Sequence, residues 1–188
     1  FQKPQVLYWW KIWLKRGVLA NEREDGMCSF SLLASHLLDR TAQWNASGTN
    51  VGGWSESDLN TYLNNRLYDA MPTQIKLLLK QVRVGSSIGN KSSDVTFSDC
   101  YIAIPSVKEV NPRINKEPYN SEGTTIPFLN QAEVSPRRAF LNGDYNAYWL
   151  RSPSADYTSY VYRVDADGDT EAITSTTDKL GVVILLSF

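Results

Sequence analysis

Short apolar runs separated by turns fill the C-terminal part of the chain, and they constrain its fold more than any other feature. The runs at 147–151, 160–164 and 182–186 are rich in aromatic and β-branched residues, which favour strands. Ala166-Asp167-Gly168-Asp169, which precedes a polar return run, has the composition of a tight turn. The sequence therefore predicts short strands in this region, two of them joined in a hairpin.

Two other segments have the spacing of helices. After Gly52-Gly53-Trp54, Ser55 can cap a helix, and Asp58 completes a capping-box pattern. The apolar stripe of this helix comprises Leu59, Tyr62, Leu63 and Leu67. A second helix is expected to begin at Pro72 and to end at Gly85, with an apolar stripe formed by Ile75, Leu78, Leu79 and Val82. The predicted fold class is therefore α+β, with both helices covering one sheet of short strands.

Smaller segments add to this outline. Residues 6–14 (VLYWWKIWL) lack a polar face at helical spacing, and we interpret them as an early core strand. Residues 27–38 are apolar, and their pattern leaves strand and helix open. Residues 101–104 have strand character, and Ser106 and Glu109 can cap a short helical turn after them.

Two segments are predicted to be loops. Residues 85–98 (GSSIGNKSSDVTFS) are rich in Gly, Ser and Asn, a composition typical of exposed turns. Residues 111–138 contain four prolines and no sustained periodicity. An irregular stretch of that length in a compact domain is either functional or mobile. We regard it as a candidate rim for a binding face.

Length and charge limit the classes of protein to which the chain can belong. A chain of 188 residues suits one domain, in which residues 1–26 are either the first core strand or the end of an upstream segment. The formal net charge of −1 lacks the electrostatic basis for binding nucleic acid or an anionic membrane. No apolar run approaches the ~20 residues that span a bilayer. Cys28 and Cys100 show no CxxC spacing, so neither a zinc motif nor a disulfide framework is present.

The sequence contains no signature of catalysis or of a cofactor. There is no G-x-S-x-G, HExxH or Walker A motif. The single histidine, His36, lies among aliphatic residues, and we interpret it as a packed or surface residue rather than a metal ligand or general base. We therefore expect a binding protein that is not an enzyme and uses no metal or other cofactor. An enzyme whose site is assembled from distant residues is one alternative.

Acidic residues suggest a calcium site in two places. Asp165, Asp167, Asp169 and Glu171 resemble a short calcium loop, but the twelve-residue EF-hand pattern is absent and a solvated hairpin is favoured. Glu117-Pro118-Tyr119-Asn120 resembles the Glu-Pro-Asn tripeptide of calcium-dependent lectins with one residue inserted. A calcium-dependent carbohydrate-binding module is therefore a second hypothesis.

The composition of residues 154–177 points to recognition. The stretch is rich in Asp, Tyr, Ser and Thr, with one Glu and no Lys, which is typical of paratopes rather than of a solubilising hairpin. In a strand, Tyr160 and Tyr162 share one face and Val161 and Arg163 the other, and we expect the two tyrosines to be exposed. The predicted ligand-binding residues are Ser154, Asp156, Tyr157, Thr158, Ser159, Tyr160, Tyr162, Asp165, Asp167, Asp169, Thr170, Ala172, Thr174 and Thr176.

Three ordered blocks resemble an uncharacterised domain family that is common in gut bacteria and their phages. They are residues 52–64 (GGWSESDLNTYLN), residues 99–110 (DCYIAIPSVKEV) and residues 148–153 (YWLRSP) with a later Gly181-Val182. The resemblance runs from about Phe30 to the end of the chain. It implies a C-type-lectin-like fold, in which two helices pack on short, mostly antiparallel strands with long loops.

Some members of this family resemble the variable proteins of diversity-generating retroelements, in which mutagenic reverse transcription rewrites a C-terminal region. Such rewriting yields Asn, Asp, Tyr, Ser, Thr, Ala and Gly but not Lys or Glu, and residues 154–177 follow this rule apart from Glu171. The resemblance implies a variable ligand-binding surface there, with Trp149, Leu150 and Arg151 as the scaffold beneath it. It also implies a template repeat and a reverse-transcriptase gene in the neighbouring DNA.

The resemblance further implies a partner and a location. The partner is a protein or glycan on a cell surface, and the domain is carried on a phage tail or on a bacterial surface, with assembly into an oligomer left open. One departure is that Gly181-Val182 is followed by Val183-Ile184 instead of the family's Arg-Pro. The likeness extends at the level of fold to formylglycine-generating enzymes, but their cysteine chemistry has no equivalent at Cys28 or Cys100, and fold kinship does not transfer function.

Overall fold

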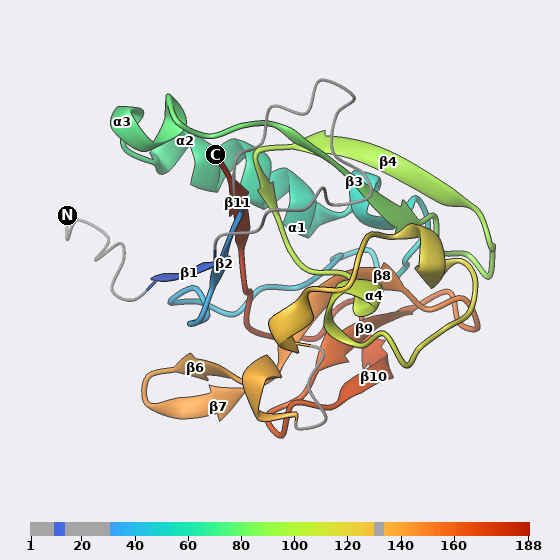
Figure 1. Cartoon of the computed structure of the whole chain (residues 1–188). Coiled ribbons are helices and arrows are strands. Elements are labelled where there is room, and N and C mark those ends of the chain that lie inside the picture. Colours follow the sequence, from blue (N-terminus) through green and yellow to red (C-terminus); the bar gives the residue numbers. More distant parts are fainter. Residues whose placement is uncertain (1–9, 14–30, 130–133) are drawn as a thin grey trace.

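Several small antiparallel sheets and a few short helices form an α+β fold in the computed structural model, which describes residues 10–13, 31–129 and 134–188 (Figure 1). The predicted fold class is confirmed at this level. The largest sheet has the strand order β1-β2-β11-β5. Its strands are β1 (Trp10–Trp13), β2 (Ser31–Ala34), β11 (Leu185–Ser187) and β5 (Ile102–Ala103). The last strand of the chain thus lies inside this sheet.

A second sheet carries the region that the sequence marks for recognition. It has the order β10-β9-β8 and consists of β8 (Tyr148–Pro153), β9 (Tyr160–Val164) and β10 (Thr170–Ser175). The strands predicted at 147–151 and 160–164 and the hairpin turn between β9 and β10 are confirmed. The strand predicted at 182–186 is shorter, since β11 begins at Leu185.

Two hairpins complete the strands in the described residues. One joins β3 (Val82–Ser87) to β4 (Val95–Cys100), and the other joins β6 (Ala139–Leu141) to β7 (Asp144–Asn146). The loop expected at 85–98 is confirmed for residues 88–94 and is wrong at both ends, because residues 85–87 belong to β3 and residues 95–98 to β4, and these strands pair along their whole length. Ser86 and Ser87 are buried, and Ser86 donates its hydroxyl to the carbonyl of Arg151 at 2.9 Å. These two serines therefore face the interior, where they form hydrogen bonds.

The first predicted helix is confirmed, but its N-cap is Ser57, two residues later than the expected Ser55. The helical segment runs continuously through α1 (Asp58–Thr61), η2 (Tyr62–Leu67), which is π-helical, and α2 (Tyr68–Ala70). The 3₁₀ turn η1 (Gly53–Glu56) contains Ser55, and Ser57 accepts the N–H of Asn60 at 3.0 Å as the N-cap. Leu59 and Leu63 from the predicted stripe are fully buried.

The second predicted helix is wrong beyond its first turn. The helix α3 covers Thr73–Lys76 alone, and Leu77 and Leu78 are 79% and 60% exposed. Val82 and Val84 are buried on either side of the exposed Arg83, which is the two-residue period of a strand. Alternating β-branched residues therefore outweigh the helical spacing of the leucines before them.

The remaining elements are short. The helix α4 (Val107–Val110) is closed by the predicted capping box between Ser106 and Glu109. The predicted long loop carries only the 3₁₀ turns η3 (Tyr119–Ser121), η4 (Pro127–Leu129) and η5 (Ser135–Arg137) in its described part. In the apolar segment 27–38, residues Ser31–Ala34 form the strand β2. The strand predicted within 6–14 is confirmed at Trp10–Trp13. The other residues of 1–30 lie outside the described part of the chain.

Two hydrophobic cores lie on opposite sides of β8 and β9. Trp149 and Val161 belong to the core that also contains Trp44 and Trp54. Side chains on the opposite faces of β8 and β9 belong to the second core, which also contains Tyr119. They are Tyr148, Leu150, Tyr162 and Val164. Every residue of β8 is buried. These strands are therefore fixed on both faces, and the connections at their ends start from rigid supports.

Candidate ligand-binding site

The connection from β8 to β9, residues 154–159, forms an exposed loop that we call the tip loop. Asp156, Tyr157 and Thr158 are exposed, and the side chain of Tyr157 is 55% exposed with its ring 5.3 Å from that of Tyr160. The buried hydroxyl of Ser154 accepts the N–H groups of Asp156 and Tyr157 at 3.2 and 3.3 Å. The loop thus presents an aromatic side chain from an ordered backbone.

A segment from a distant part of the sequence completes this surface. Thr49 donates its hydroxyl to the carbonyl of Thr158 at 3.3 Å, and Val51, two residues later, is 43% exposed. We call the side chains of Thr49, Val51, Asp156, Tyr157, Thr158 and Tyr160 the tip surface. Thr49 and Val51 are absent from the predicted set, because the residue types around them are those of an ordinary loop.

The predicted site is divided between the two ends of β9. The turn that contains Asp165, Asp167 and Asp169 follows the C-terminal end of β9, whereas the tip loop precedes its N-terminal end. At the turn, Asp165 Oδ1 accepts the N–H groups of Asp167 and Asp169, each at 2.9 Å. Gly168 has a φ of 95°, and a Cβ there would lie 2.5 Å from the carbonyl oxygen of Val134. The Asp165 carboxylate therefore stabilises a turn at the opposite end of β9 from the tip surface.

Several predicted ligand-binding residues are buried, which corrects the sequence prediction. The exposed fraction is 1% for Ser154, 7% for Tyr162, 3% for Thr174 and 0% for Thr176. Tyr162 was expected to be exposed with Tyr160, but β9 is the middle strand of its sheet and this face covers the second core. The Tyr162 ring packs edge-on against that of Tyr119 at 5.0 Å. Tyr160 stays half-exposed because it stands at the strand end.

Other predicted residues are neither buried nor fully exposed. Ser159, Thr170 and Ala172 are half-buried, and Thr170 accepts a hydrogen bond from the Asn111 side chain at 2.7 Å. On the same edge strand, Ile173 is 63% exposed although it is absent from the predicted set. Of the predicted residues, only Asp156, Tyr157, Thr158 and Tyr160 belong to the tip surface.

The two proposed calcium positions are engaged in contacts within the protein. Glu171 forms an ion pair with Arg163 at 2.8 Å, and Asn120 Oδ1 accepts a hydrogen bond from Lys108 Nζ at 2.9 Å. In the part of the chain that the structure describes, no group of three or more His, Cys, Asp or Glu side chains could hold a metal ion.

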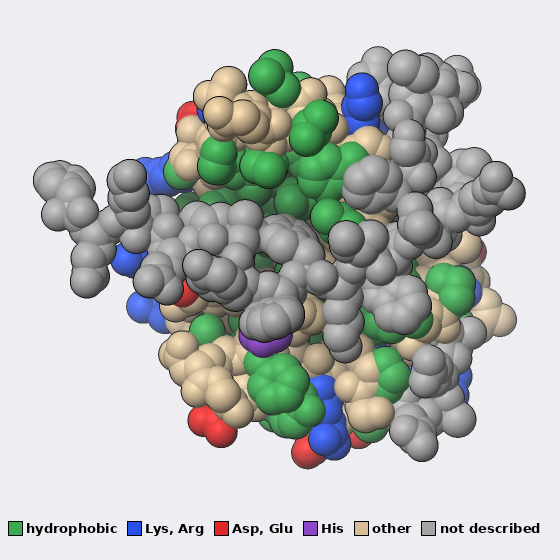
Figure 2. Space-filling view, turned by 60° about the vertical axis from the view of Figure 1, so that its left-hand side comes forward, with side chains coloured by type: hydrophobic (Ala, Val, Ile, Leu, Met, Phe, Trp, Pro, Cys, Tyr) green, Lys and Arg blue, Asp and Glu red, His purple; other side chains and the backbone are tan. Residues whose placement is uncertain are grey.

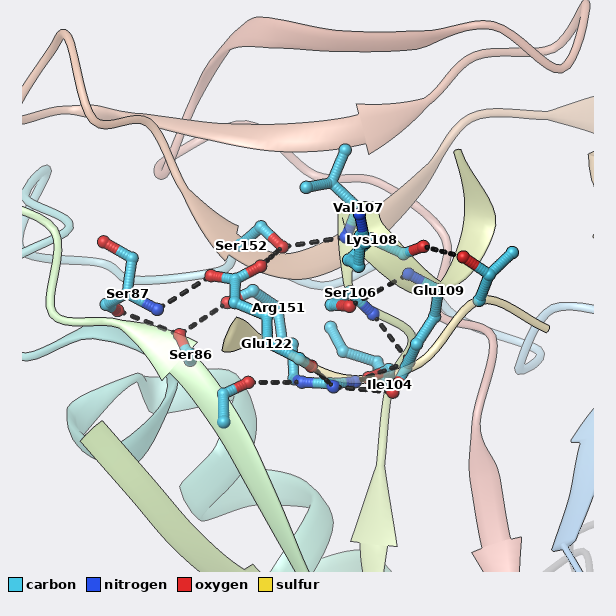
Figure 3. A network of polar contacts seen from close by, with 12 residues as sticks. Ser86, Ser87, Ile104, Ser106, Val107, Lys108, Glu109, Glu122, Arg151 and Ser152 are labelled. Carbon is cyan, nitrogen blue, oxygen red and sulfur yellow. Dashed lines mark hydrogen bonds and ion pairs between the residues drawn. The ribbon is translucent and has the colours of Figure 1, made fainter. Parts of the chain in front are cut away.

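Beneath the tip loop lies a buried polar network centred on Arg151 (Figure 3). Its guanidinium donates both to Glu109, in two bonds of 2.7 Å, and to the carbonyls of Gly85 at 2.9 Å, Ile104 at 2.8 Å and Glu122. All five N–H donors of the fully buried arginine therefore have partners. Burial alone would lower the pKa of Arg151, but the neighbouring Glu109 carboxylate raises it. The network connects β8 to β3, to α4 and to Ile104, the residue that follows β5.

Glu122 is the one acid of this network without a cation on its carboxylate. Its Oε1 accepts the N–H of Ser87 at 2.7 Å, and its Oε2 contacts the hydroxyl of Ser152, while Arg151 is occupied by Glu109. Burial raises the pKa of Glu122 to about 7, against the opposing effects of the bonds from Ser152 and Ser87 and of the Arg151 charge. Glu122 is thus neutral below pH 7 in the folded chain, and Arg151 and Glu109 balance each other.

The Glu122 carboxyl should make folding stability depend on pH. Its pKa rises from 4.5 to about 7 on folding, so its contribution is present below pH 4.5 and is lost as pH increases to about 7. In Glu122→Gln this dependence is removed. Between pH 4.5 and 8 the wild type should therefore lose roughly 3 kcal/mol relative to this variant, because one pKa unit corresponds to about 1.4 kcal/mol. Urea unfolding of both proteins across this range checks the difference, and parallel pH profiles would contradict it.

A cavity of about 190 Å³ lies on another face, at the parallel bridge between His36 and Phe140. Figure 2 shows His36, the purple side chain, beside hydrophobic side chains. The His36 ring stacks on Phe140 at 5.7 Å, and its Nδ1 lies 3.0 Å from the Ser35 hydroxyl. A serine hydroxyl beside an imidazole is two parts of a catalytic triad, but among the described residues no carboxylate contacts the other ring nitrogen of His36.

The geometry defines an α+β domain with an aromatic tip surface on a rigid, buried polar scaffold. Residues 29–187 match the sequence profile of a family described as a domain of unknown function (DUF6273), and the chain belongs to this family. Neither the curated proteins nor the solved structures contain a significant match. None of the helices in the described residues is long and apolar enough to cross a membrane.

Proposed function

We propose that this chain is a ligand-binding domain with a C-type-lectin-like fold, which binds a protein or glycan of a cell surface through the tip surface and performs no catalysis. The observation that carries the proposal is the exposure of Tyr157 in a hydrogen-bonded loop, with its ring 5.3 Å from that of Tyr160. Tyrosines supply a large contact area at little cost in conformational entropy. A loop that is already ordered avoids the cost of ordering on binding.

The charges around the tip surface support recognition without an ion. Asp156 forms an ion pair with Lys116 at 3.5 Å, so its carboxylate is already balanced. The side chains that remain are aromatic, aliphatic or hydroxyl groups, which bind through contact area and neutral hydrogen bonds. A calcium-dependent lectin has less support, because the Asp165 carboxylate accepts the N–H groups of its own turn and Glu171 is paired with Arg163.

The finer proposal concerns origin and location. We propose that the tip loop is the exposed part of a region diversified by a retroelement, on a phage tail or a bacterial surface. Its support is the composition of residues 154–177 together with the exposure of Asp156, Tyr157 and Thr158. The neighbouring DNA tests this directly, because a template repeat would differ from this gene at adenines. Without such a repeat, the proposal reduces to an ordinary binding domain.

Tyr157→Ala should weaken binding about 30-fold, because truncating an aromatic anchor in a contact costs about 2 kcal/mol. Fluorescently labelled protein is titrated on a panel of intact bacterial cells by flow cytometry, with and without EDTA. Tyr145→Ala is the matched control, since Tyr145 is 42% exposed on β7, away from the tip loop. Equal staining by wild type and Tyr157→Ala would show that the tip surface is not the binding site, and loss of staining in EDTA would favour a calcium lectin.

A further inference from the structure

Asn50, immediately before the Val51-Gly52-Gly53-Trp54 segment, is fully buried against the tip loop. Its side-chain Nδ2 lies 2.7 Å from the carbonyl oxygen of Tyr157, 2.8 Å from that of Tyr160 and 3.3 Å from that of Ser154. Its backbone N–H donates to the carbonyl of Thr158 at 2.7 Å. An amide has two N–H donors, so the longest contact shares a hydrogen with a shorter one. One asparagine thus binds the backbone at three residues of the tip loop and at Tyr160, the first residue of β9.

The same side chain also anchors the loop to the β3–β4 hairpin. Asn50 Oδ1 accepts the N–H of Asn90 at 2.9 Å. The neighbouring Gly89 has a φ of 67°, and a Cβ there would lie 2.1 Å from the carbonyl oxygen of Asn50. Close approach of the two backbones is therefore possible only with glycine at this position. In Figure 1 the β3–β4 hairpin and the β8–β9 connection lie on the same side of the molecule.

We propose that Asn50 is the positioning residue of the tip surface, holding the loop backbone in the shape that presents Tyr157 to the ligand. Its partners in the tip loop are backbone carbonyls, so these contacts do not depend on the side chains at 156–158. The shape of the loop is thereby set from outside the loop. The effect on binding rests on the proposed function, whereas the effect on loop order does not.

Asn50→Asp separates these two effects. A carboxylate has no N–H donor and would face the carbonyl oxygens of Tyr157 and Tyr160, which repel it. We expect the tip-loop amides at 155–160 to exchange hydrogen at least about tenfold faster, because losing these bonds opens the loop locally. The readout is hydrogen–deuterium exchange of the full chain by mass spectrometry. Cell staining by the labelled variant, as above, should weaken together with this change.

Asn64→Asp is the matched control, because the Asn64 side chain also binds backbone groups, but at residues 101 and 102. Its Nδ2 donates to the carbonyl of Ile102 at 2.8 Å, and its Oδ1 accepts the N–H groups of Tyr101 and Ile102 at 2.9 and 3.0 Å. It thereby fixes β5 to the helical segment rather than the tip loop. This variant should lower the melting temperature and leave exchange at 155–160 unchanged.

The outcomes distinguish a positioning role from a general one. Faster exchange confined to 155–160 in Asn50→Asp supports the proposal. Unchanged exchange there, or equal acceleration in Asn64→Asp, overturns it. If Asn50→Asp does not fold, Asn50→Ala removes the donors without adding charge, and the same criteria apply. If neither variant folds, Asn50 determines the whole fold, which overturns a role confined to the tip surface. Faster exchange with unchanged cell staining would leave the positioning role intact and refute the proposed function of the tip.

Discussion

Arg151→Met is expected to lower the free energy of unfolding by about 3–5 kcal/mol, the usual cost of removing one partner of a buried ion pair. The substitution leaves the Glu109 carboxylate buried without its cation, and it leaves the carbonyls of Gly85, Ile104 and Glu122 without their donor. Typical domains have a stability of only 5–15 kcal/mol. Urea unfolding at neutral pH, followed by tryptophan fluorescence, measures the loss.

Two variants show whether burial is the cause of this loss. Arg163→Met removes a similar pair on the neighbouring strand β9, but Arg163 and Glu171 are 28% and 37% exposed, so this change should cost less than about 1 kcal/mol. The double variant Arg151→Met/Glu109→Gln should recover part of the loss, because no unpaired charge remains. If Arg163→Met is as destabilising as Arg151→Met, burial of the pair is not what makes Arg151 important.

The strands beside the tip loop could be predicted, whereas the β3–β4 hairpin could not. β8 and β9 are apolar runs bounded by turn residues, which is a local signal. Residues 85–98 read as a loop because Ser86 and Ser87 are polar, yet the partners that make their burial favourable, Arg151 and Glu122, are distant in sequence. Composition alone does not distinguish an exposed serine from a buried serine with a remote partner.

The candidate site was predictable only in part. The composition of 154–177 selected Asp156, Tyr157 and Thr158, which are exposed. It also selected Tyr162 and Thr174, whose burial follows from the neighbours of their strands and not from their own residue types. Asn50 gave no signal, because its partners in the tip loop lie more than 100 residues later in the chain. Contacts of this kind arise only from the three-dimensional fold.

Trp149→Ala is expected to lower the free energy of unfolding by about 3–5 kcal/mol, the range for truncating a buried aromatic residue to alanine. Trp149 is fully buried in the first core, on the strand that separates the two cores. Its indole Nε1 donates to the carbonyl of Ala42 at 2.7 Å. For a chain of this size each kcal/mol lowers the melting temperature by about 2–4 °C, so a fall of about 10 °C should appear in thermal unfolding followed by circular dichroism.

Trp149→Phe and Tyr157→Ala test whether Trp149 contributes to stability and Tyr157 to binding. Trp149→Phe keeps an aromatic ring but leaves the carbonyl of Ala42 without its donor, and it should cost less than Trp149→Ala, about 1–3 kcal/mol. Tyr157→Ala removes an aromatic side chain that is 55% exposed, and it should leave the melting temperature nearly unchanged while weakening binding. A melting temperature as low for Tyr157→Ala as for Trp149→Ala would mean that Tyr157 belongs to the scaffold, because a side chain that stabilises the fold to that degree is not held free for a ligand.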